Sequence, residues 1–201
     1  MKHVRITSEQ DSKQIADLRI SAYQSSKDFR LVNSNFLEWG EKEKTCPVIG
    51  VWNNDDNAIA TILLIVVDNA QKAARTIEYD LPIEVPFPAL VFSRAATKQT
   101  YRRRGFNQLI RYHCIKAALE CNINSLLSPV FEHATRTGFM KEMGYQFYTP
   151  QETCRDKIIP ANIRKLAVLE RSKMEYAVQV IEQRIPDLIR EYPWDGDPII
   201  F

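Results

Sequence analysis

Three arginines that directly precede a glycine are the first residues of this chain whose types and spacing suggest chemistry. Residues 102–107 read Arg-Arg-Arg-Gly-Phe-Asn, and they separate an apolar run at 89–97 from a helical pattern that ends near Glu120. The first backbone N–H groups of a helix have no intrahelical partner, and the helix dipole adds positive potential there. Glycine lets a phosphate approach the main chain, and guanidinium groups match phosphate oxygens. The pattern therefore predicts a pyrophosphate-binding loop, whereas an isolated basic triplet would be a solvated turn.

Two further polar residues follow the second apolar run of the chain, at 123–130. Glu132 and His133 come almost directly after this predicted strand. Ligands of open α/β sheets gather beyond the carboxyl ends of the strands, and a carboxylate or an imidazole can act there as a general base. We predict a catalytic role for Glu132 or His133, and the sequence leaves helix capping or surface exposure open as the alternative.

The elements that must position these residues follow from hydrophobic periodicity and turn signals. Strands are predicted at residues 4–6, 46–52, 58–67, 89–97, 123–130 and within 162–171. Helices are predicted after the capping residues 7–11, at 35–42, from the basic loop to near Glu120, before Gly144 and Tyr145, and at 172–184 and 187–191. Residues 68–81 are predicted to form an irregular loop. On the helix after the basic loop, Leu109 and His113 are predicted on the apolar side and Arg111 on the polar side.

Composition limits the classes of protein that the chain can belong to. With 201 residues, 45% of them hydrophobic, it suits one globular domain over 1–201, with 150–201 as a C-terminal extension. A net charge of +2 without a long basic tract argues against a nucleic-acid partner. The amino-terminal residues lack a signal-peptide core, and no apolar run approaches the ~18 residues of a membrane span. The four cysteines lack metal-ligand spacing, so we expect reduced thiols, no metal and a cytoplasmic location.

The basic loop carries a specific resemblance. Residues 102–107 resemble the Gln/Arg-x-x-Gly-x-Gly/Ala pyrophosphate loop of the GCN5-related N-acetyltransferases, and 139–145 resemble their Tyr-x-x-x-Gly-Phe ending. The likeness spans about 58–148. It implies an α/β fold with a mixed, mostly antiparallel central sheet, splayed central strands and flanking helices. Met140 stands where many members have a tyrosine that protonates the departing thiolate, so Tyr145 becomes the candidate for a displaced acid.

A narrower resemblance concerns the donor. Residues 93–97 resemble the Ser-Arg-Leu/Phe-Ala-Val strand of N-acyl-homoserine lactone synthases and long-chain N-acyl amino acid synthases, and 18–23 are similar to the Leu-Arg-Tyr-x-Val-Phe of their first helix. These relatives take a fatty acyl group, often from acyl carrier protein. Val91 occupies the position of their usual glutamate.

The resemblance implies an N-acyltransferase that moves an acyl group, acetyl in the first instance, from acyl-CoA to a primary amine of a small molecule. The cofactor-binding candidates it implies are Ala95, Ala96, Thr97, Arg102, Arg103, Arg104, Gly105, Phe106 and Asn107. The catalytic candidates are Glu132, His133 and Tyr145. Two alternatives stay open: a long-chain synthase that uses acyl carrier protein, and a non-catalytic acyl-CoA-binding regulatory module. The C-terminal extension is apolar enough to serve as a lid or as the interface of a homodimer.

Overall fold

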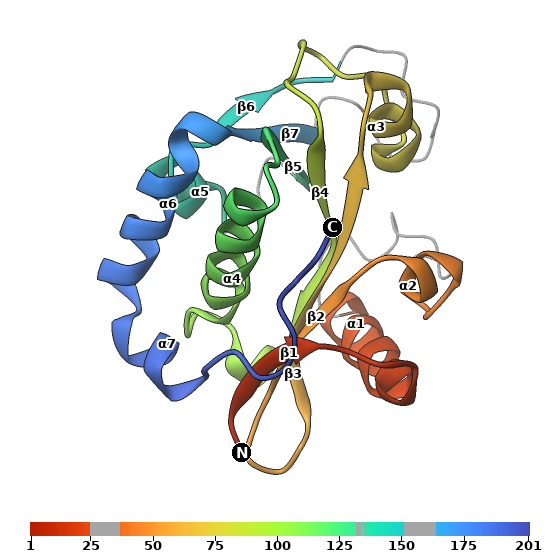
Figure 1. The fold of residues 1–201 in the computed structure, drawn as a ribbon. Helices are drawn as coiled ribbons and strands as arrows, with labels where there is room; N and C mark the ends of the chain where they lie inside the picture. The colour runs from red at the N-terminus through yellow and green to blue at the C-terminus, as the bar shows by residue number, and fades with distance from the viewer. Residues whose placement is uncertain (25–36, 132–133, 135, 151–163) are drawn as a thin grey trace. The chain divides into compact units, whose positions relative to one another are not determined.

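The computed structural model describes residues 1–24, 37–131, 134, 136–150 and 164–201. Its contacts divide the chain into two compact units, which are described one at a time. The first unit comprises Met1–Leu64, Arg94–Cys114 and Ile181–Ile200, and the second comprises Ile65–Ser93, Ile115–Val180 and Phe201. The described strands form one seven-stranded sheet in the order β1-β2-β3-β4-β5-β7-β6 (Figure 1), which confirms the predicted mixed α/β class.

An antiparallel meander forms the sheet portion of the first unit. β1 (His3–Ile6) pairs with β2 (Val48–Trp52), and β2 pairs with β3 (Ala58–Val67). The run of β-branched and aliphatic residues in β2 and β3 favours strands that are buried on both faces, and every residue of β2 is buried. The side chain of Asn53 accepts hydrogen bonds from the N–H groups of Asp55 and Asn57, which closes the hairpin turn.

Two helices of the first unit begin at capping residues. A 3-10 turn, η1 (Glu9–Asp11), precedes α1 (Ser12–Gln24), and the Asp11 carboxylate accepts from the Ser8 N–H at 2.7 Å. The helix predicted at 35–42 is wrong in position, because α2 runs over Glu41–Thr45. Gly40 is extended, and its N–H donates to the Glu43 side chain at 3.0 Å, so the helix begins only after this glycine. Residues 35–36 lie outside the described part.

The C-terminal segment joins the first unit beside β1 (Figure 1). After α7 (Pro186–Glu191), the Val4 N–H donates to the Pro193 carbonyl at 2.9 Å and the Asp195 N–H donates to the Val4 carbonyl at 2.8 Å. Ile199 is buried as well. This end of the chain is therefore held by strand-like hydrogen bonds.

The second unit is built around a strand pairing that stops early. β4 (Ala89–Thr97) runs parallel to β5 (Ser125–Phe131), but the register covers only three pairs and ends at Val91 and Leu127. β5 then continues its antiparallel pairing with β7 (Arg164–Glu170) as far as Phe131. Pro129 has no N–H to give to a ladder on its other side. This partial pairing is the separation of central strands that the sequence resemblance implies.

The remaining elements of the second unit end the sheet. β6 (Gln146–Tyr148) pairs antiparallel with β7, and α5 (Thr137–Glu142) precedes β6. Gly144 has φ 90°, and the Tyr145 N–H donates to the Met140 carbonyl at 3.0 Å, so the helix ends in a glycine turn. α6 (Arg171–Arg184) follows β7 and contributes residues to both units.

The irregular loop predicted at 68–81 is wrong, because the structure contains α3 (Ala70–Ile77) there. Asn69 caps the helix by accepting from the Lys72 N–H at 2.9 Å, and Ala73, Ala74 and Ile77 form its buried side. The polar residues at 68–72 are typical of a loop. A helix forms instead because Asn69 caps its first turn and the apolar residues that follow form a buried side.

Replacement of the cap tests the assignment of α3. We expect Asn69→Ala to lower the free energy of unfolding by about 1 kcal/mol, because the Lys72 N–H loses its acceptor. Asn69→Ser is the matched control, since its hydroxyl can still accept from the Lys72 N–H and adds no charge beside Asp68, and it should retain most of the wild-type stability. Chemical denaturation measures both variants. Equal loss in the two would show that capping does not hold this helix.

Candidate phosphate-binding site

The basic loop of the first unit changes the direction of the chain in a few residues. After β4 and a 3-10 turn, η4 (Gln99–Tyr101), Arg103 has φ 61° and Gly105 has φ 89°. α4 (Phe106–Glu120) starts at once, and its first helical hydrogen bond runs from the Leu109 N–H to the Gly105 carbonyl at 2.9 Å. The three amides before Leu109 therefore lie in the helix turn whose N–H groups have no helical acceptor.

Gly105 is required for its conformation and for the space around it. A Cβ added there would lie 2.9 Å from Ile185 Cγ2 and 3.2 Å from Leu188 Cδ2. A side chain is thus opposed both by the positive φ and by the contact with α7. The packing of α7 against this glycine holds the start of α4 in place.

Aromatic side chains pack together at the end of the basic loop, where α4 begins. Tyr101 and Phe106 meet edge to face with ring centroids 5.6 Å apart, and Phe106 meets Tyr192 in the same way at 5.1 Å. The Arg104 guanidinium lies 5.6 Å from the centre of the Tyr101 ring. These residues border a cavity of about 480 Å³ within the first unit. Its other lining residues are Lys2, Asn53, Asn54, Asp55, Leu188 and Glu191.

The three arginines of the loop differ in what they contact. Arg102 donates to two backbone carbonyls, Thr97 at 3.3 Å and Ala22 at 2.5 Å, and so ties the loop to the end of α1. Arg103 is exposed and makes no hydrogen bond or ion pair with a described residue. Arg103 and Arg104 are therefore the guanidinium groups best placed to meet an anion from solvent.

Arg111 does not lie on the polar side of α4, and that prediction was wrong. Its side chain is only 1% exposed, and Nε donates to the Asn107 Oδ1 atom at 3.1 Å, one turn earlier in the helix. A long side chain can lie along the helix and bury its stem, which periodicity alone does not reveal. Arg111 therefore supports the first turn of α4 from inside and adds nothing to an exposed basic cluster.

The β4 residues predicted to bind the donor lie beside a local distortion. Arg94, within the strand, has φ 52°, a conformation that is uncommon for a residue with a side chain. The Ala95 carbonyl accepts from the Tyr23 hydroxyl at 3.4 Å, and the Thr97 carbonyl accepts from Arg102. Ala96 is buried. The strand is thus held at Ala95 and Thr97 by side chains from α1 and from the basic loop.

The predicted catalytic residues are less well defined than the loop. Glu132 and His133 lie outside the described residues. Tyr145 is 4% exposed and Met140 is fully buried, both within the second unit. A donor of protons to a leaving thiolate must meet substrate, so the role of Tyr145 stays a prediction.

A buried charged cluster in the first unit was not identified as functional from the sequence. Glu43 bonds Arg19 at 2.7 Å and also pairs with Arg94, and the side-chain exposures of Arg19, Glu43 and Arg94 are 0%, 0% and 10%. Burial alone would raise the pKa of Glu43, but the Gly40 N–H and the two guanidinium groups hold it below its ordinary 4.5. The sequence did contain a signal for this cluster: Arg19 falls within the apolar stripe of α1, and a buried arginine requires an anion as its partner.

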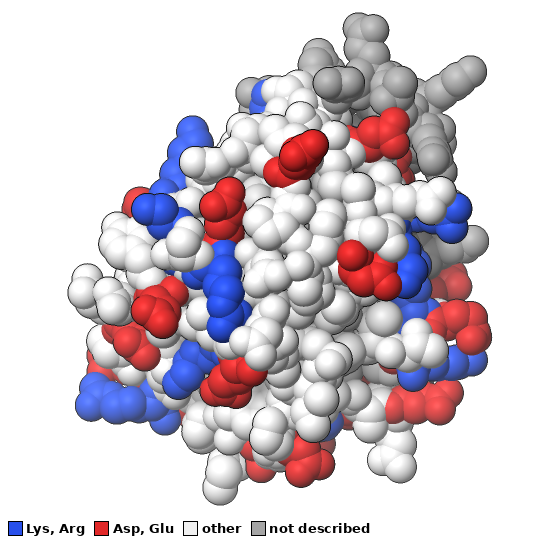
Figure 2. Space-filling model, turned by 45° about the horizontal axis from the view of Figure 1, so that its top comes forward, with Lys and Arg blue, Asp and Glu red and all other residues white. Residues whose placement is uncertain are grey.

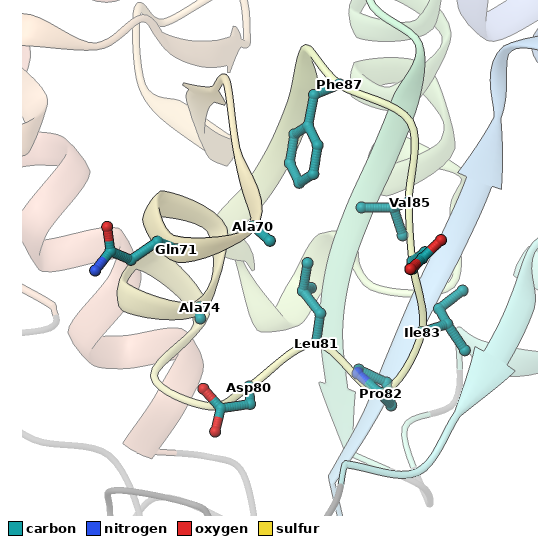
Figure 3. Close-up of a pocket in the computed structure, with 10 residues that line it drawn as sticks. Ala70, Gln71, Ala74, Asp80, Leu81, Pro82, Ile83, Val85 and Phe87 are labelled. Carbon is teal, nitrogen blue, oxygen red and sulfur yellow. The ribbon is translucent and has the colours of Figure 1, made fainter.

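A second cavity, of about 740 Å³, lies within the second unit between α3 and the segment that leads to β4. Leu81, Val85 and Phe87 point into it from that segment (Figure 3). Its charged lining residues are Asp80 and Glu84. Two carboxylates without any basic residue in the lining do not suit phosphate groups, so this cavity is not the phosphate site.

Two further features were sought among the described residues. These residues contain no group of His, Cys, Asp and Glu arranged to hold a metal ion. None of their helices has the length and apolar character needed to cross a membrane. Acidic and basic side chains are interspersed on the face shown in Figure 2, which is unlike the continuous basic surface of a nucleic-acid binder.

Solved structures share this architecture, although no protein-family model and no curated protein sequence matches the chain. The acyl-homoserine lactone synthase BjaI, solved with SAM and isopentyl-CoA, matches 99% of this chain and 96% of its own with a TM-score of 0.67 at 11% identity. FeeM, an N-acyl amino acid synthase from uncultured soil microbes, matches 91% of this chain and 98% of its own with a TM-score of 0.58 at 15% identity. An acetyltransferase of the GNAT family from Listeria monocytogenes matches 84% and 94% with a TM-score of 0.58 at 14% identity.

The fold is therefore one that is shared by acyltransferases. In particular, it is the fold of the GCN5-related N-acetyltransferases, and the sequence resemblance is confirmed at the level of fold.

Replacement of the loop glycine separates backbone strain from packing. We expect Gly105→Ala to lower the free energy of unfolding by about 1–2 kcal/mol for the positive φ, and by more for the contact with Ile185. Gly196→Ala is the control, because Gly196 has φ 108° and open space around its Cα. Urea denaturation should show the larger loss for Gly105→Ala. Equal losses would mean that α7 does not constrain the loop.

The depressed pKa of Glu43 predicts a pH dependence of stability. Its contribution is complete above its ordinary pKa of 4.5 and is lost as the pH falls through the lower folded-state pKa. We expect Glu43→Gln to be less stable at pH 7 by about 3–5 kcal/mol, because Arg19 loses its buried counter-ion, and to lose less on acidification than the wild type. Glu41→Gln, on the exposed side of α2, should match the wild type when melting is followed from pH 7 down to about pH 2, which covers the range below 4.5 in which the Glu43 carboxylate is protonated. If Glu43→Gln lost as much stability on acidification as the wild type, titration of Glu43 would not be the cause of the loss.

Proposed function

We propose that the protein is an N-acyltransferase that moves an acyl group from acyl-CoA to a primary amine of a small molecule in the cytoplasm. One observation carries the proposal: the turn at Gly105 presents the first amides of α4 beside two arginines that are open to solvent. The shared fold supports it, since the matching structures include acyltransferases. We treat residues 1–201 as one catalytic domain.

The donor is held at its phosphates and along its pantetheine arm. The first-turn amides of α4 bind the pyrophosphate, and Arg103 and Arg104 add charge-assisted hydrogen bonds. The backbone at Ala95, Ala96 and Thr97 binds the pantetheine amides and the thioester carbonyl. The cavity beside Tyr101 and Arg104 accepts the nucleotide end of CoA.

The reaction is a direct transfer within this arrangement. The lone pair of a neutral amine attacks the thioester carbon, the C–N bond forms, the C–S bond breaks, and a proton passes from nitrogen to the thiolate. Orientation supplies most of the acceleration, with effective molarities up to ~10⁵–10⁸ M for well-placed groups. Glu132 or His133 serves as the base and Tyr145 as the acid, each contributing about 10²–10⁴-fold.

A long-chain acyl donor, carried by CoA or by acyl carrier protein, is the second candidate. The share of this chain that each solved structure matches favours this candidate. The two synthases match 99% and 91% of the chain, whereas the GNAT-family acetyltransferase matches 84%. A non-catalytic acyl-CoA-binding module remains the third reading, because Met140 replaces the usual tyrosine.

Ligand-induced stabilisation tests donor binding. A ligand that binds only the folded state raises the melting temperature according to its affinity. We expect stabilisation in the order acetyl-CoA and CoA, then dephospho-CoA, then pantetheine, because each step removes anionic groups. Arg103→Ala/Arg104→Ala should weaken CoA binding about 10–100-fold without affecting pantetheine. Arg75→Ala, an exposed arginine on α3, is the control.

The same titration separates the alternatives. A larger shift with a long-chain acyl-CoA would favour the synthase reading. Thiol release from acetyl-CoA in the presence of an amine panel would establish transfer, and tight CoA binding without release would favour the non-catalytic module. No shift with any thioester would contradict the proposed donor.

A further inference from the structure

Residues 185–195 of the first unit, which we call the C-terminal strap, contact the start of α4 at two points. The Cδ2 atom of Leu188 lies 3.2 Å from the position that a Cβ on Gly105 would take. The ring of Tyr192 meets the ring of Phe106, the first residue of α4, edge to face at 5.1 Å. The strap therefore packs against the residue at which the chain turns and the residue at which the helix begins.

The helix within the strap does not hold this position by itself. α7 has six residues, none of them buried, and a helix of this length is not stable alone in water. The strap is fixed after the helix, where the side chain of Tyr192 is 3% exposed. Backbone hydrogen bonds then join Pro193 and Asp195 to Val4. Docking of the strap thus depends on a few contacts, among which Tyr192 is the buried side-chain anchor.

The strap also forms one wall of the cavity that we propose for the nucleotide end of CoA. Its residues in the lining are Leu188, Glu191 and Tyr192, and those of the loop and the start of α4 are Tyr101, Arg104 and Phe106. Glu191 is paired with Lys2, whose ammonium lies 5.5 Å from the centre of the Tyr192 ring. The carboxylate on this wall is therefore compensated by a cation. A ligand in the cavity contacts the loop and the strap at once.

We propose that the strap is part of the donor site, in which Leu188 and Tyr192 are positioning residues for the first-turn amides of α4. The affinity for the phosphates of the donor then depends on docking of the strap. The inference rests on the proposed binding of acyl-CoA. Backbone amides bind an anion tightly when the turn that carries them is preorganised, because little motion is then lost on binding. Since linkage is reciprocal, a donor that requires the docked strap must also stabilise the docked strap.

Isothermal titration calorimetry with CoA and with pantetheine separates the phosphate-dependent part of the affinity. We expect Leu188→Ala and Tyr192→Ala to weaken CoA binding about 10-fold and to leave pantetheine binding unchanged, because only the phosphates use the first-turn amides. Tyr192→Phe should keep most of the CoA affinity, since the edge-to-face contact needs the ring and not the hydroxyl. Tyr176→Ala, which removes an exposed tyrosine from α6, is the control and should bind CoA as the wild type does.

Hydrogen exchange measures the positioning of the turn without any donor. In the unliganded protein, both alanine variants should exchange faster at the Leu109 amide, whose hydrogen bond to Gly105 closes the first turn of α4. In the wild type, CoA should slow exchange at Asp195, whose N–H bonds the Val4 carbonyl when the strap is docked. Leu188 is only half-buried, so Leu188→Ala carries both measurements if Tyr192→Ala does not fold.

Two results would overturn the inference: wild-type affinity for CoA in the folded alanine variants, or an equal loss of affinity for CoA and for pantetheine. Failure of the proposed function gives a different result, because the wild type itself would then bind no CoA or CoA thioester. Exchange at Leu109 in the unliganded variants would still decide whether the strap positions the turn.

Discussion

The structure depends on a single constraint at Gly105, where the chain must turn from β4 into α4 without a side chain. The positive φ and the contact with Ile185 and Leu188 both require glycine, and the turn leaves the first amides of α4 facing away from any helical acceptor. Arg102 ties the turn to the end of α1, and the rings of Tyr101, Phe106 and Tyr192 support it. An anion site made of backbone groups needs this rigidity, because its donors cannot adjust as side chains do.

In the second unit, the pairing between β4 and β5 is incomplete. β4 and β5 share three register pairs, after which β5 remains paired with β7 alone. A hydrogen-bonded ladder would have occupied the backbone groups that an amide-rich ligand such as pantetheine can use. In the first unit, Arg19 is buried with its Nε and Nη2 atoms unpaired among the described residues, which costs stability. In both places the fold leaves polar groups without a partner among the described residues.

Much of the fold could be predicted from the sequence wherever a local pattern determines the structure. The β-branched run of β3, the glycine at position 105 and the glycine turn at Gly144 each specify their structure locally. α3 was missed because the signal of its Asn69 cap lay among polar residues that are typical of loops. The burial of Arg111 and the sharing of Glu43 could not be predicted, because they depend on which elements meet in space rather than on periodicity. The likeness of residues 102–107 to a known loop predicted a phosphate site there, whereas no comparable motif indicated where the acceptor binds.

Hydrogen exchange at the start of α4 would show whether these backbone amides bind the phosphates of the donor. Mass spectrometry would follow exchange of the backbone amides of Phe106, Asn107 and Gln108 with and without acetyl-CoA. We expect acetyl-CoA to slow exchange at these amides, because each gains a phosphate acceptor in place of water. Saturating acetyl-CoA that protects other segments but leaves this turn unchanged would contradict it.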